Sequence, residues 1–366
     1  MRRAPVATGL SHGRRQPARH PAAAVAQALQ RAGLAQANGV LLFLTPDYAP
    51  QATEAVRAAA RAARCTQVVG CTASGLITES EWVLDSPGAA AMVFGGDLGL
   101  APPRPRHYHG EAVLSFCTPR GIHAEWLDQP LHRLGAVASD VVEQGQFLVW
   151  QGARVAEGGC AQAQLDGARH AAGVSQGIQA LTAPIEVAEV AGYEVLRMGS
   201  YPALNVLVQS LPTDVVSVDQ IPLHLLIGGV TYGDPDNAIA EGRYRLNHII
   251  AADPGSRSIT LAQPLHAGER LFWGMRDALA AERDMQRAIR QARRALGRPP
   301  DFGCLFPCVG RGPSFYGNRD RDVDLLRQAF PDMPFIGFYG NGEIGPLQGD
   351  NHLYQYSSVL GLFAAG

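Results

Sequence analysis

The sequence predicts an α/β protein of the mixed α+β class, built from two related lobes that each contain a mixed sheet with flanking helices. The main observation is a pair of glycine-rich turns far apart in the chain, at residues 70–75 and 337–345. Glycine adopts positive φ angles without strain and allows close backbone approach, so such turns are typical of tight loops after strands. The length of 366 residues also favours two domains over one core.

The two turns lie in matching contexts, which indicates an internal repeat. Residues 68–77 align with residues 335–344 at a constant spacing, so that Gly70 matches Gly337 and Gly75 matches Gly342. Each copy has an apolar run, a helical segment and a final apolar run, at 40–44, 53–64 and 91–94 and at 303–306, 322–330 and 359–363. We therefore predict two strand–helix–strand–turn–strand units whose glycine turns face a shared cleft, a common position for a small-molecule site.

The remaining elements follow from local patterns. Residues 4–10 predict a strand, and 22–31 predict a helix that ends at Gly33. Apolar runs and turn residues predict, in order, a strand pair over 113–124, a short helix over 124–134, short strands over 147–216, a strand over 223–230 and a hairpin over 242–250 and 258–261. Helical spacing of apolar residues is clearest over 277–296. A boundary near 217–222 divides the chain into predicted domains 1–220 and 221–366.

The composition excludes several classes of chemistry. The chain contains no lysine, so all 31 basic residues are arginine. Schiff-base catalysis, a Walker A phosphate loop and a kinase-type ATP site each require a lysine. The net charge of −2 gives no overall attraction to nucleic acid or to an anionic membrane. No run of 18 apolar residues occurs, so we expect no membrane-spanning segment.

The six cysteines are scattered and form no CxxC motif. Residues 1–20 contain five arginines and no apolar stretch of the kind found in secretory signals. Free thiols in a reducing compartment fit this pattern best, so we expect a cytoplasmic protein. The lysine-free composition, rich in alanine, arginine and glycine, suggests a GC-rich bacterial genome.

Two charged residues in glycine-rich surroundings are candidates for ligand recognition. Arg311 lies between two glycines, where its guanidinium can reach a carboxylate or phosphate, although an ion pair with Asp320, Asp322 or Glu343 is an equal alternative. Glu343 can accept a ligand ammonium group, or it can be bonded to local amides. Together the two residues suit a zwitterion such as an amino acid.

The full set of candidate ligand-binding residues combines these side chains with the two turns. The turn amides would supply backbone hydrogen bonds, and Tyr339 would form an apolar or stacking wall. The set is Gly70, Cys71, Thr72, Ser74, Gly75, Cys308, Arg311, Tyr339, Gly340, Asn341, Gly342 and Glu343.

Three other interpretations are weighed against this one. A thiol enzyme would use Cys71 or Cys308, but no familiar Cys–His signature is present, and a buried structural cysteine is the simpler interpretation. A haem site would need a histidine such as His132, His248 or His352; the only close histidine pair is His107 and His109. The arginines on one face of the helix expected at 277–296 fit a solvated face better than a polyanion site.

The sequence resembles a known family, the FIST domains. Cys308-x-x-Arg311-Gly312 followed by Gly337-Phe338-Tyr339-x-x-Gly342-Glu343-Ile344 is similar to the FIST C domain, as are the segments 242–247, 253–254, 261–268 and 276–277. Gly70-Cys71-Thr72-x-x-Gly75 is similar to the FIST N domain, as are the segments 174–177, 184–187 and 202–204. The resemblance covers nearly the whole chain.

The resemblance implies a sensory protein that binds a small ligand, with amino acids as the usual proposed ligands and a separate signalling protein as partner. Some bacterial members are haem-binding sensors of nitric oxide, so haem is the one alternative to an expectation of no cofactor and no metal. Two features depart from the family pattern. Ile178 replaces a cysteine found in many members, and we expect no output domain in this protein. The resemblance implies neither an enzyme nor a nucleic-acid or membrane partner.

Overall fold

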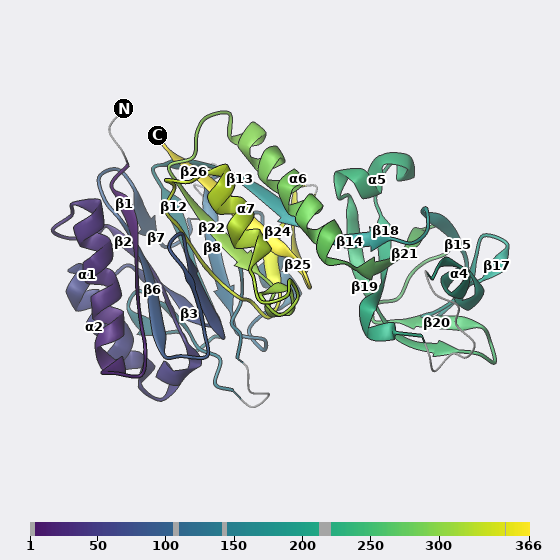
Figure 1. The fold of residues 1–366 in the computed structure, drawn as a ribbon, viewed down its shortest axis with the longest axis horizontal. Coiled ribbons are helices and arrows are strands. Elements are labelled where there is room, and N and C mark those ends of the chain that lie inside the picture. The colour runs from purple at the N-terminus through teal and green to yellow at the C-terminus, as the bar shows by residue number, and fades with distance from the viewer. Residues whose placement is uncertain (1–3, 105–109, 141–144, 212–220, 348) are drawn as a thin grey trace. The chain divides into compact units, whose positions relative to one another are not determined.

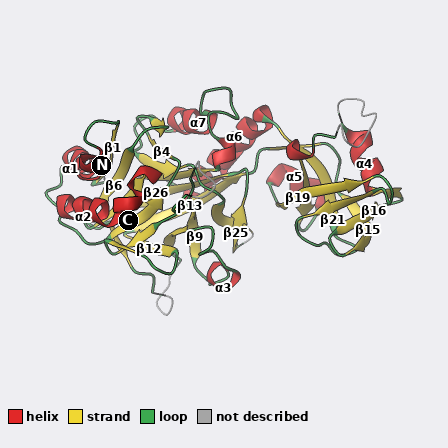
Figure 2. Cartoon of the chain, turned by 90° about the horizontal axis from the view of Figure 1, so that it is seen from below, coloured by secondary structure: helices red, strands yellow, loops and turns green. Residues whose placement is uncertain are grey.

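The computed structural model describes residues 4–104, 110–140, 145–211, 221–347 and 349–366 (Figure 1). Its contacts group the chain into two compact units, Met1–Ser175 with Met285–Gly366 and Gln176–Asp284. The mixed α+β class predicted from the sequence is confirmed (Figure 2). The predicted domains 1–220 and 221–366 divide the sequence at a single point. The two units divide it differently, because the first unit combines segments from both ends of the sequence.

The first predicted repeat forms a six-stranded sheet in the first unit. The strand order is β1-β6-β2-β3-β10-β11, with β2 and β3 parallel. The bounds are β1 Val6–His12, β2 Gly39–Leu44, β3 Val68–Thr72, β6 Gly88–Phe94, β10 Val149–Gln151 and β11 Arg154–Val155. Helices α1 (His20–Ala32) and α2 (Ala52–Ala63) bury alanine-rich faces against this sheet (Figure 1).

The second predicted repeat forms a sheet of the same design, with order β13-β26-β22-β23-β4-β5. Strands β22 and β23 are parallel, as β2 and β3 are. The bounds are β4 Gly75–Thr78, β5 Trp82–Leu84, β13 Ala168–Ser175, β22 Phe302–Pro307, β23 Phe335–Phe338 and β26 Ser358–Ala365. Helix α6 (Ala278–Leu296), from Met285 onwards, and helix α7 (Arg321–Ala329) pack on it.

A third copy of the unit was not expected from the sequence. Its sheet has the order β25-β24-β9-β8-β12-β7, and β8 and β9 are parallel. The bounds are β7 Gly99–Ala101, β8 Ala112–Cys117, β9 His132–Val137, β12 Cys160–Asp166, β24 Glu343–Leu347 and β25 Asp350–Tyr354. We call β2 to β6 repeat 1, β8 to β12 repeat 2, and β22 to β26 repeat 3.

Each repeat gives its hairpin to the sheet of another repeat. The β4–β5 hairpin pairs with β23, the β10–β11 hairpin with β3, and the β24–β25 hairpin with β9. The exchange is cyclic, so the first unit has approximate internal three-fold symmetry. No sheet is complete without a strand from another repeat, which makes the three sheets interdependent.

Glycine permits the central parallel pairs to approach closely. Gly70, Gly135 and Gly337 face Leu42, Ser115 and Leu305 in the neighbouring strand. A Cβ atom on these glycines would lie 1.8, 1.8 and 1.6 Å from the facing carbonyl oxygen. The next residue in each partner strand is a phenylalanine, and the rings of Phe43, Phe116 and Phe306 have centroids 5.2–6.3 Å apart.

The second unit is a closed ring of six antiparallel strands, β21-β15-β16-β20-β19-β18, because β18 pairs with both β19 and β21. Strand β14 pairs with β21, and β17 pairs with β16. The bounds are β14 Ile178–Ala180, β15 Ile185–Ala191, β16 Glu194–Met198, β17 Tyr201–Pro202, β18 Leu226–Thr231, β19 Tyr244–Asp253, β20 Ser258–Leu261 and β21 Arg270–Arg276. Apolar side chains such as Trp273 form its core.

Three local expectations were wrong. The strand pair expected over 113–124 is the single strand β8, which ends at Cys117 and is followed by a turn over 119–121 rather than by a second strand. The helix expected over 124–134 is only α3 (Ala124–Leu127), and β9 begins at His132 because Pro130 disfavours a continuing helix. Within 147–216, where only strands were expected, residues Ala203–Ser210 form α4, which buries Ala203, Leu204 and Leu207 at helical spacing. Helix α5 (Pro235–Glu241), with Asp234 as its N-cap, was also missed. The domain boundary expected near 217–222 lies mostly outside the described residues.

We expect Gly135→Ala to destabilise the protein as strongly as Gly70→Ala or Gly337→Ala. The added methyl group would overlap a backbone carbonyl that cannot move without breaking the parallel pair, so each change should cost about 3 kcal/mol or more. Urea unfolding measures the loss. Gly158→Ala is the matched control, because a Cβ there would meet nothing within 4 Å. A mild effect at Gly135 alone would contradict an equivalent role for this glycine in repeat 2.

Candidate functional site

Arg311 lies in the interior of the first unit and binds protein groups rather than facing solvent. It ends the short 3-10 helix Val309–Arg311 after β22, and its side chain is 1% exposed. Its guanidinium pairs with both carboxylate oxygens of Asp322 at 2.9 and 3.1 Å and donates to the Ser175 carbonyl and hydroxyl at 2.8 and 2.7 Å. Of the two alternatives considered for Arg311, the structure therefore has the ion pair with an aspartate. Through these bonds Arg311 connects the end of β13 to α7.

Tyr339 belongs to the same buried network. Its hydroxyl donates to Asp320 at 2.6 Å, and Asp320 also accepts the amide of Val323 as the N-cap of α7. Burial and the neighbouring charge of Asp322 raise the pKa of Asp320 to about 6, although the Tyr339 hydroxyl opposes this shift. With 1% of its surface exposed, Tyr339 is placed to hold α7 rather than to line an open pocket.

Glu343 is fully buried at the first position of β24. Its Oε2 atom accepts the Ser357 hydroxyl at 2.7 Å and the Ser357 amide at 3.3 Å, whereas Oε1 has no hydrogen-bond partner among the described residues. Burial raises the pKa of Glu343 from 4.5 to about 8, and the Ser357 hydrogen bonds only partly oppose this shift. The carboxyl group therefore holds a proton at neutral pH, so it is a poor partner for a ligand ammonium group.

Comparison of the three repeats shows that Glu343 occupies a core position. In the strand pairing, Val149 faces Cys71 and Leu76 faces Phe338, and Glu343 faces Ala136 in the same register. Repeats 1 and 2 therefore place an apolar residue where repeat 3 places a carboxylic acid. The alignment of residues 68–77 with 335–344 already matches Leu76 with Glu343, whereas the equivalence of Val149 is visible only in the structure.

The two predicted glycine turns meet in the structure, although their amides bind neighbouring chain segments. The amide of Tyr339 donates to the Gly75 carbonyl at 3.1 Å, and that of Asn341 donates to the Val137 carbonyl at 3.0 Å. The Ser74 amide donates to the Ser139 hydroxyl, which donates in turn to the Tyr339 carbonyl. The glycines allow this packing: a Cβ on Gly75 would lie 2.7 Å from the Tyr339 ring, and Gly342 has φ +121°.

The two candidate nucleophilic thiols are buried and protonated. Cys71 has no exposed surface, and burial raises its pKa well above the usual value. Burial and the carboxyl group of Glu343 raise the pKa of the Cys308 thiol to about 12. Neither environment favours a thiolate, and the thiol-enzyme alternative stays an untested prediction.

An open cavity of about 560 Å³ adjoins the first predicted turn at the carboxyl ends of β2 and β3. Ser74, one of the predicted residues, lies in its wall. The other described lining residues are Thr45, Pro46, Asp47, Asp85, Ser86, Asp140 and Gly145. Crevices at the carboxyl ends of parallel strands are frequent ligand sites in α/β proteins, so this cavity is the candidate functional site.

The cavity wall has fixed and charged groups. The Thr45 hydroxyl donates to Asp47 at 2.7 Å and accepts the Gly88 amide at 3.0 Å, which holds the loop after β2 in place. Asp85 has φ +58°, a backbone conformation that costs energy for a residue other than glycine. Sequence reasoning missed these residues, although the Thr45-Pro46-Asp47 segment directly after an apolar strand was a usable signal.

The histidines give no metal centre among the residues that the structure describes. No group of three or more histidine, cysteine or acidic side chains in these ranges has the geometry to hold a metal ion. The His132 ring lies 5.6 Å from that of His170, and the His352 ring lies 6.3 Å from that of Tyr354. His107 and His109 fall outside the described residues, and haem binding stays an untested prediction. None of the described helices is long and apolar enough to cross a membrane.

The fold and cavity define an internally repeated α/β protein with a candidate ligand site at a sheet edge. Sequence models of the FIST N domain and the FIST C domain match residues 38–200 and 203–346. Because these matches cover most of the sequence, the chain belongs to the FIST family, whose domains are associated with sensory signal transduction.

Relatives are found in bacteria and animals. An uncharacterized protein of Mycobacterium tuberculosis is 25% identical over 376 residues, covering 93% of this chain and 96% of that protein. An uncharacterized protein of Mycobacterium bovis is 27% identical over 232 residues, covering 63% of this chain and 60% of that protein. F-box only protein 22 of Homo sapiens is 31% identical over 81 residues, covering 18% of this chain and 20% of that protein.

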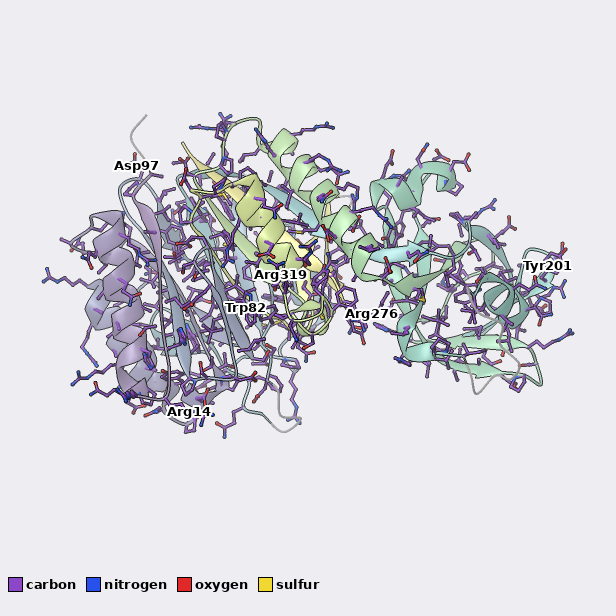
Figure 3. All side chains as sticks on the ribbon, in the orientation of Figure 1. Arg14, Trp82, Asp97, Tyr201, Arg276 and Arg319 are labelled. Carbon is purple, nitrogen blue, oxygen red and sulfur yellow. The ribbon has the colours of Figure 1, made fainter. Side chains whose placement is uncertain are left out.

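Arg311→Met should destabilise the protein by about 3–5 kcal/mol, because Asp322 would remain buried without its counter-charge. Urea unfolding of both proteins measures the difference. Arg319→Met is the control, since Arg319 lies at the surface with 73% of its side chain exposed (Figure 3). Unchanged stability in Arg311→Met would show that the ion pair is not structural.

The raised pKa of Glu343 predicts a defined pH dependence of stability. The folded state keeps this proton while the unfolded chain loses it, so the contribution is complete below pH 4.5 and falls as pH rises towards 8. The slope is at most about 1.4 kcal/mol per pH unit. Glu343→Gln, which cannot ionise, should lack this decline in urea unfolding at several pH values, whereas exposed Glu54→Gln should retain it. Parallel profiles for Glu343→Gln and the unmodified protein would contradict the assignment.

Proposed function

We propose that this protein is a cytoplasmic bacterial sensor that binds a small polar molecule carrying a protonated amine in the cavity at the ends of β2 and β3, and that it signals through a separate protein partner. The observation that carries this proposal is the convergence of Asp47, Asp85 and Asp140 on one cavity beside the predicted turn. Membership of the FIST family supports the sensory part of the proposal.

The chemistry of the cavity favours a cation. Three aspartates from separate loops line the same cavity, and no arginine is among the described lining residues. A protonated amine would gain from these charges and could also donate hydrogen bonds to them. Because Asp47 and Asp85 are exposed, dissolved salt can screen their attraction for a bound amine. The affinity should therefore fall as ionic strength rises.

Amino acids are compatible with this site in one orientation. The ammonium group would face the carboxylates, while the Ser86 hydroxyl group supplies a donor for the ligand carboxylate. The buried Arg311 is committed to Asp322 and takes no part in this scheme. The earlier assignment of the ligand carboxylate to Arg311 and of its ammonium to Glu343 is therefore replaced by the cavity residues.

A chain of contacts connects the cavity with helix α7. Ser74 lines the cavity and bonds to Ser139, which donates to the Tyr339 carbonyl. The Tyr339 hydroxyl bonds to Asp320, the N-cap of α7. Ligand binding that shifts Ser74 would bias the position of α7, and a partner that recognises this helix would read the occupied state.

The proposed compartment rests on the cysteines. All six are free thiols, including the partly exposed Cys65 and Cys160. Free exposed thiols persist in reducing surroundings. The haem sensor remains an alternative from the family resemblance, and a Soret band after haem reconstitution would favour it over the amine sensor.

Asp47→Asn and Asp85→Asn should each weaken the binding of amines by up to about fivefold, since each removes a charge–charge contact worth up to about 1 kcal/mol at an exposed site. Isothermal titration with a panel of free amino acids and simple diamines measures the affinity. The exposed Glu157→Gln variant should bind as the unmodified protein does. Raising the salt concentration should weaken binding to the unmodified protein more than to the Asp47→Asn variant.

A panel of carboxylic acids that lack an amine, tested on the same protein, can contradict the proposal. If carboxylates without an amine bind more tightly than amines, or if the Asp47→Asn and Asp85→Asn variants retain full affinity, the cavity assignment fails. If Arg311→Met abolishes binding and the cavity variants do not, the ligand binds at the buried network around Arg311 instead of in the cavity.

A further inference from the structure

Two cysteines face each other across neighbouring strands of repeat 2. Cys117 ends β8, Cys160 begins β12, and the two residues are directly opposite in the antiparallel pairing. The next pair along, Thr118 and Gly159, is joined by a hydrogen bond of 2.8 Å from the Thr118 amide to the Gly159 carbonyl. Because antiparallel pairs alternate, Cys117 and Cys160 form a pair without backbone hydrogen bonds, for which the Cα separation is about 4.5 Å.

The two side chains share one face of the sheet. Both belong to a small apolar cluster with Trp126, Val137 and Ile344. Cys117 has no exposed surface, whereas Cys160 is partly exposed and its thiol donates to the Gly121 carbonyl at 2.9 Å. A Cα spacing of about 4.5 Å, general for such pairs, lies within the range of about 4.4–6.8 Å that a disulfide requires. The pair thus combines a partly exposed thiol with a buried cysteine directly opposite it.

We propose that Cys117 and Cys160 are a redox-sensitive pair that forms a reversible intramolecular disulfide with a peroxide oxidant. The sulfur of Cys160 attacks one peroxide oxygen, the O–O bond breaks, and water leaves, which converts the thiol into a sulfenic acid. The sulfur of Cys117 then attacks the Cys160 sulfur and displaces a second water. Two thiols lose two electrons and two protons, and one peroxide is reduced to two waters.

The surroundings of the two cysteines make their oxidation by peroxide slow. Burial raises the pKa of both thiols, and the positive charge of Arg133 partly opposes this effect at each sulfur. Arg133 is held beside the strands by hydrogen bonds from its Nη1 atom to Ser115 and Gln162 at 3.1 and 2.8 Å. Since the thiolate is the reacting form, oxidation should accelerate as pH rises.

The internal symmetry shows that the pair is specific to repeat 2. The equivalent cross-strand positions hold Leu44 and Ala89 in repeat 1, and Pro307 and Ser358 in repeat 3. The geometry of the repeat therefore does not require sulfur at this place. The Cys117 carbonyl accepts the amide of Ala138, next to the Ser139 that contacts Ser74 in the candidate cavity wall. The proposal does not depend on any ligand in that cavity.

The test is peptide mapping of the reduced full chain after treatment with hydrogen peroxide, followed by alkylation of the remaining thiols and digestion without reductant. We expect the intact protein to lose the mass of two hydrogens, and a linked peptide pair containing Cys117 and Cys160 to form and to disappear with dithiothreitol. The rate of linkage should rise between neutral and mildly alkaline pH.

Variants separate this pair from other thiols. Cys65→Ser removes a partly exposed cysteine that has no cysteine opposite it, and it should leave the linkage unchanged. Cys160→Ser and Cys117→Ala should each abolish the linked peptide, and circular dichroism verifies that both variants are folded. The proposal is overturned if peroxide gives only oxygenated Cys160, a linkage to another cysteine, dimers joined between chains, or modification of Cys65 with no link between Cys117 and Cys160.

Discussion

The close approach of three parallel strand pairs is the constraint on which the first unit depends. At Gly70, Gly135 and Gly337 a carbonyl oxygen of the partner strand occupies the space that a side chain would need. This approach allows the three pairs to converge on the phenylalanine cluster, where Phe338 packs 4.7–5.9 Å from the other three rings. The exchanged hairpins then fix the repeats to one another, because each sheet is completed by a neighbour.

Against this regular frame, the departures from symmetry carry the chemical information. Repeat 3 buries a carboxylic acid where the other repeats have Leu76 and Val149, and it adds an arginine–aspartate pair at 1% and 0% exposure. Buried ionisable groups are costly compared with apolar residues of similar size. Repeat 1 instead has an open cavity with exposed carboxylates at its sheet edge. The repeats thus share a scaffold while differing in whether their polar groups face the interior or solvent.

The sequence predicted the two repeats because both retain the long helix between parallel strands and the glycine-rich turn. It did not reveal repeat 2, in which the connection contains only the short α3 and the turn after Gly135 lacks the second glycine. Glycine spacing also suggested ligand contact, whereas Gly75 serves packing against Tyr339. The sequence offered the Arg311–Asp322 ion pair and a bonded Glu343 as alternatives to ligand binding. It could not decide between them, because burial of these groups depends on contacts with Ser175 and Ser357 that only the fold creates.

The position of the cavity suggests how a small ligand could influence the whole unit. Its wall combines Thr45, Asp47, Ser74 and Asp85 from repeat 1 with Asp140 from repeat 2, so a ligand there touches the seam between repeats. Ser139, at the same seam, contacts Ser74 of repeat 1 and Tyr339 of repeat 3. Packed cores resist gradual deformation, and displacement at a seam is more readily accommodated than distortion within one repeat. Because the hairpins interlock, a shift of repeat 1 against repeat 2 must be shared by repeat 3 and its helix α7.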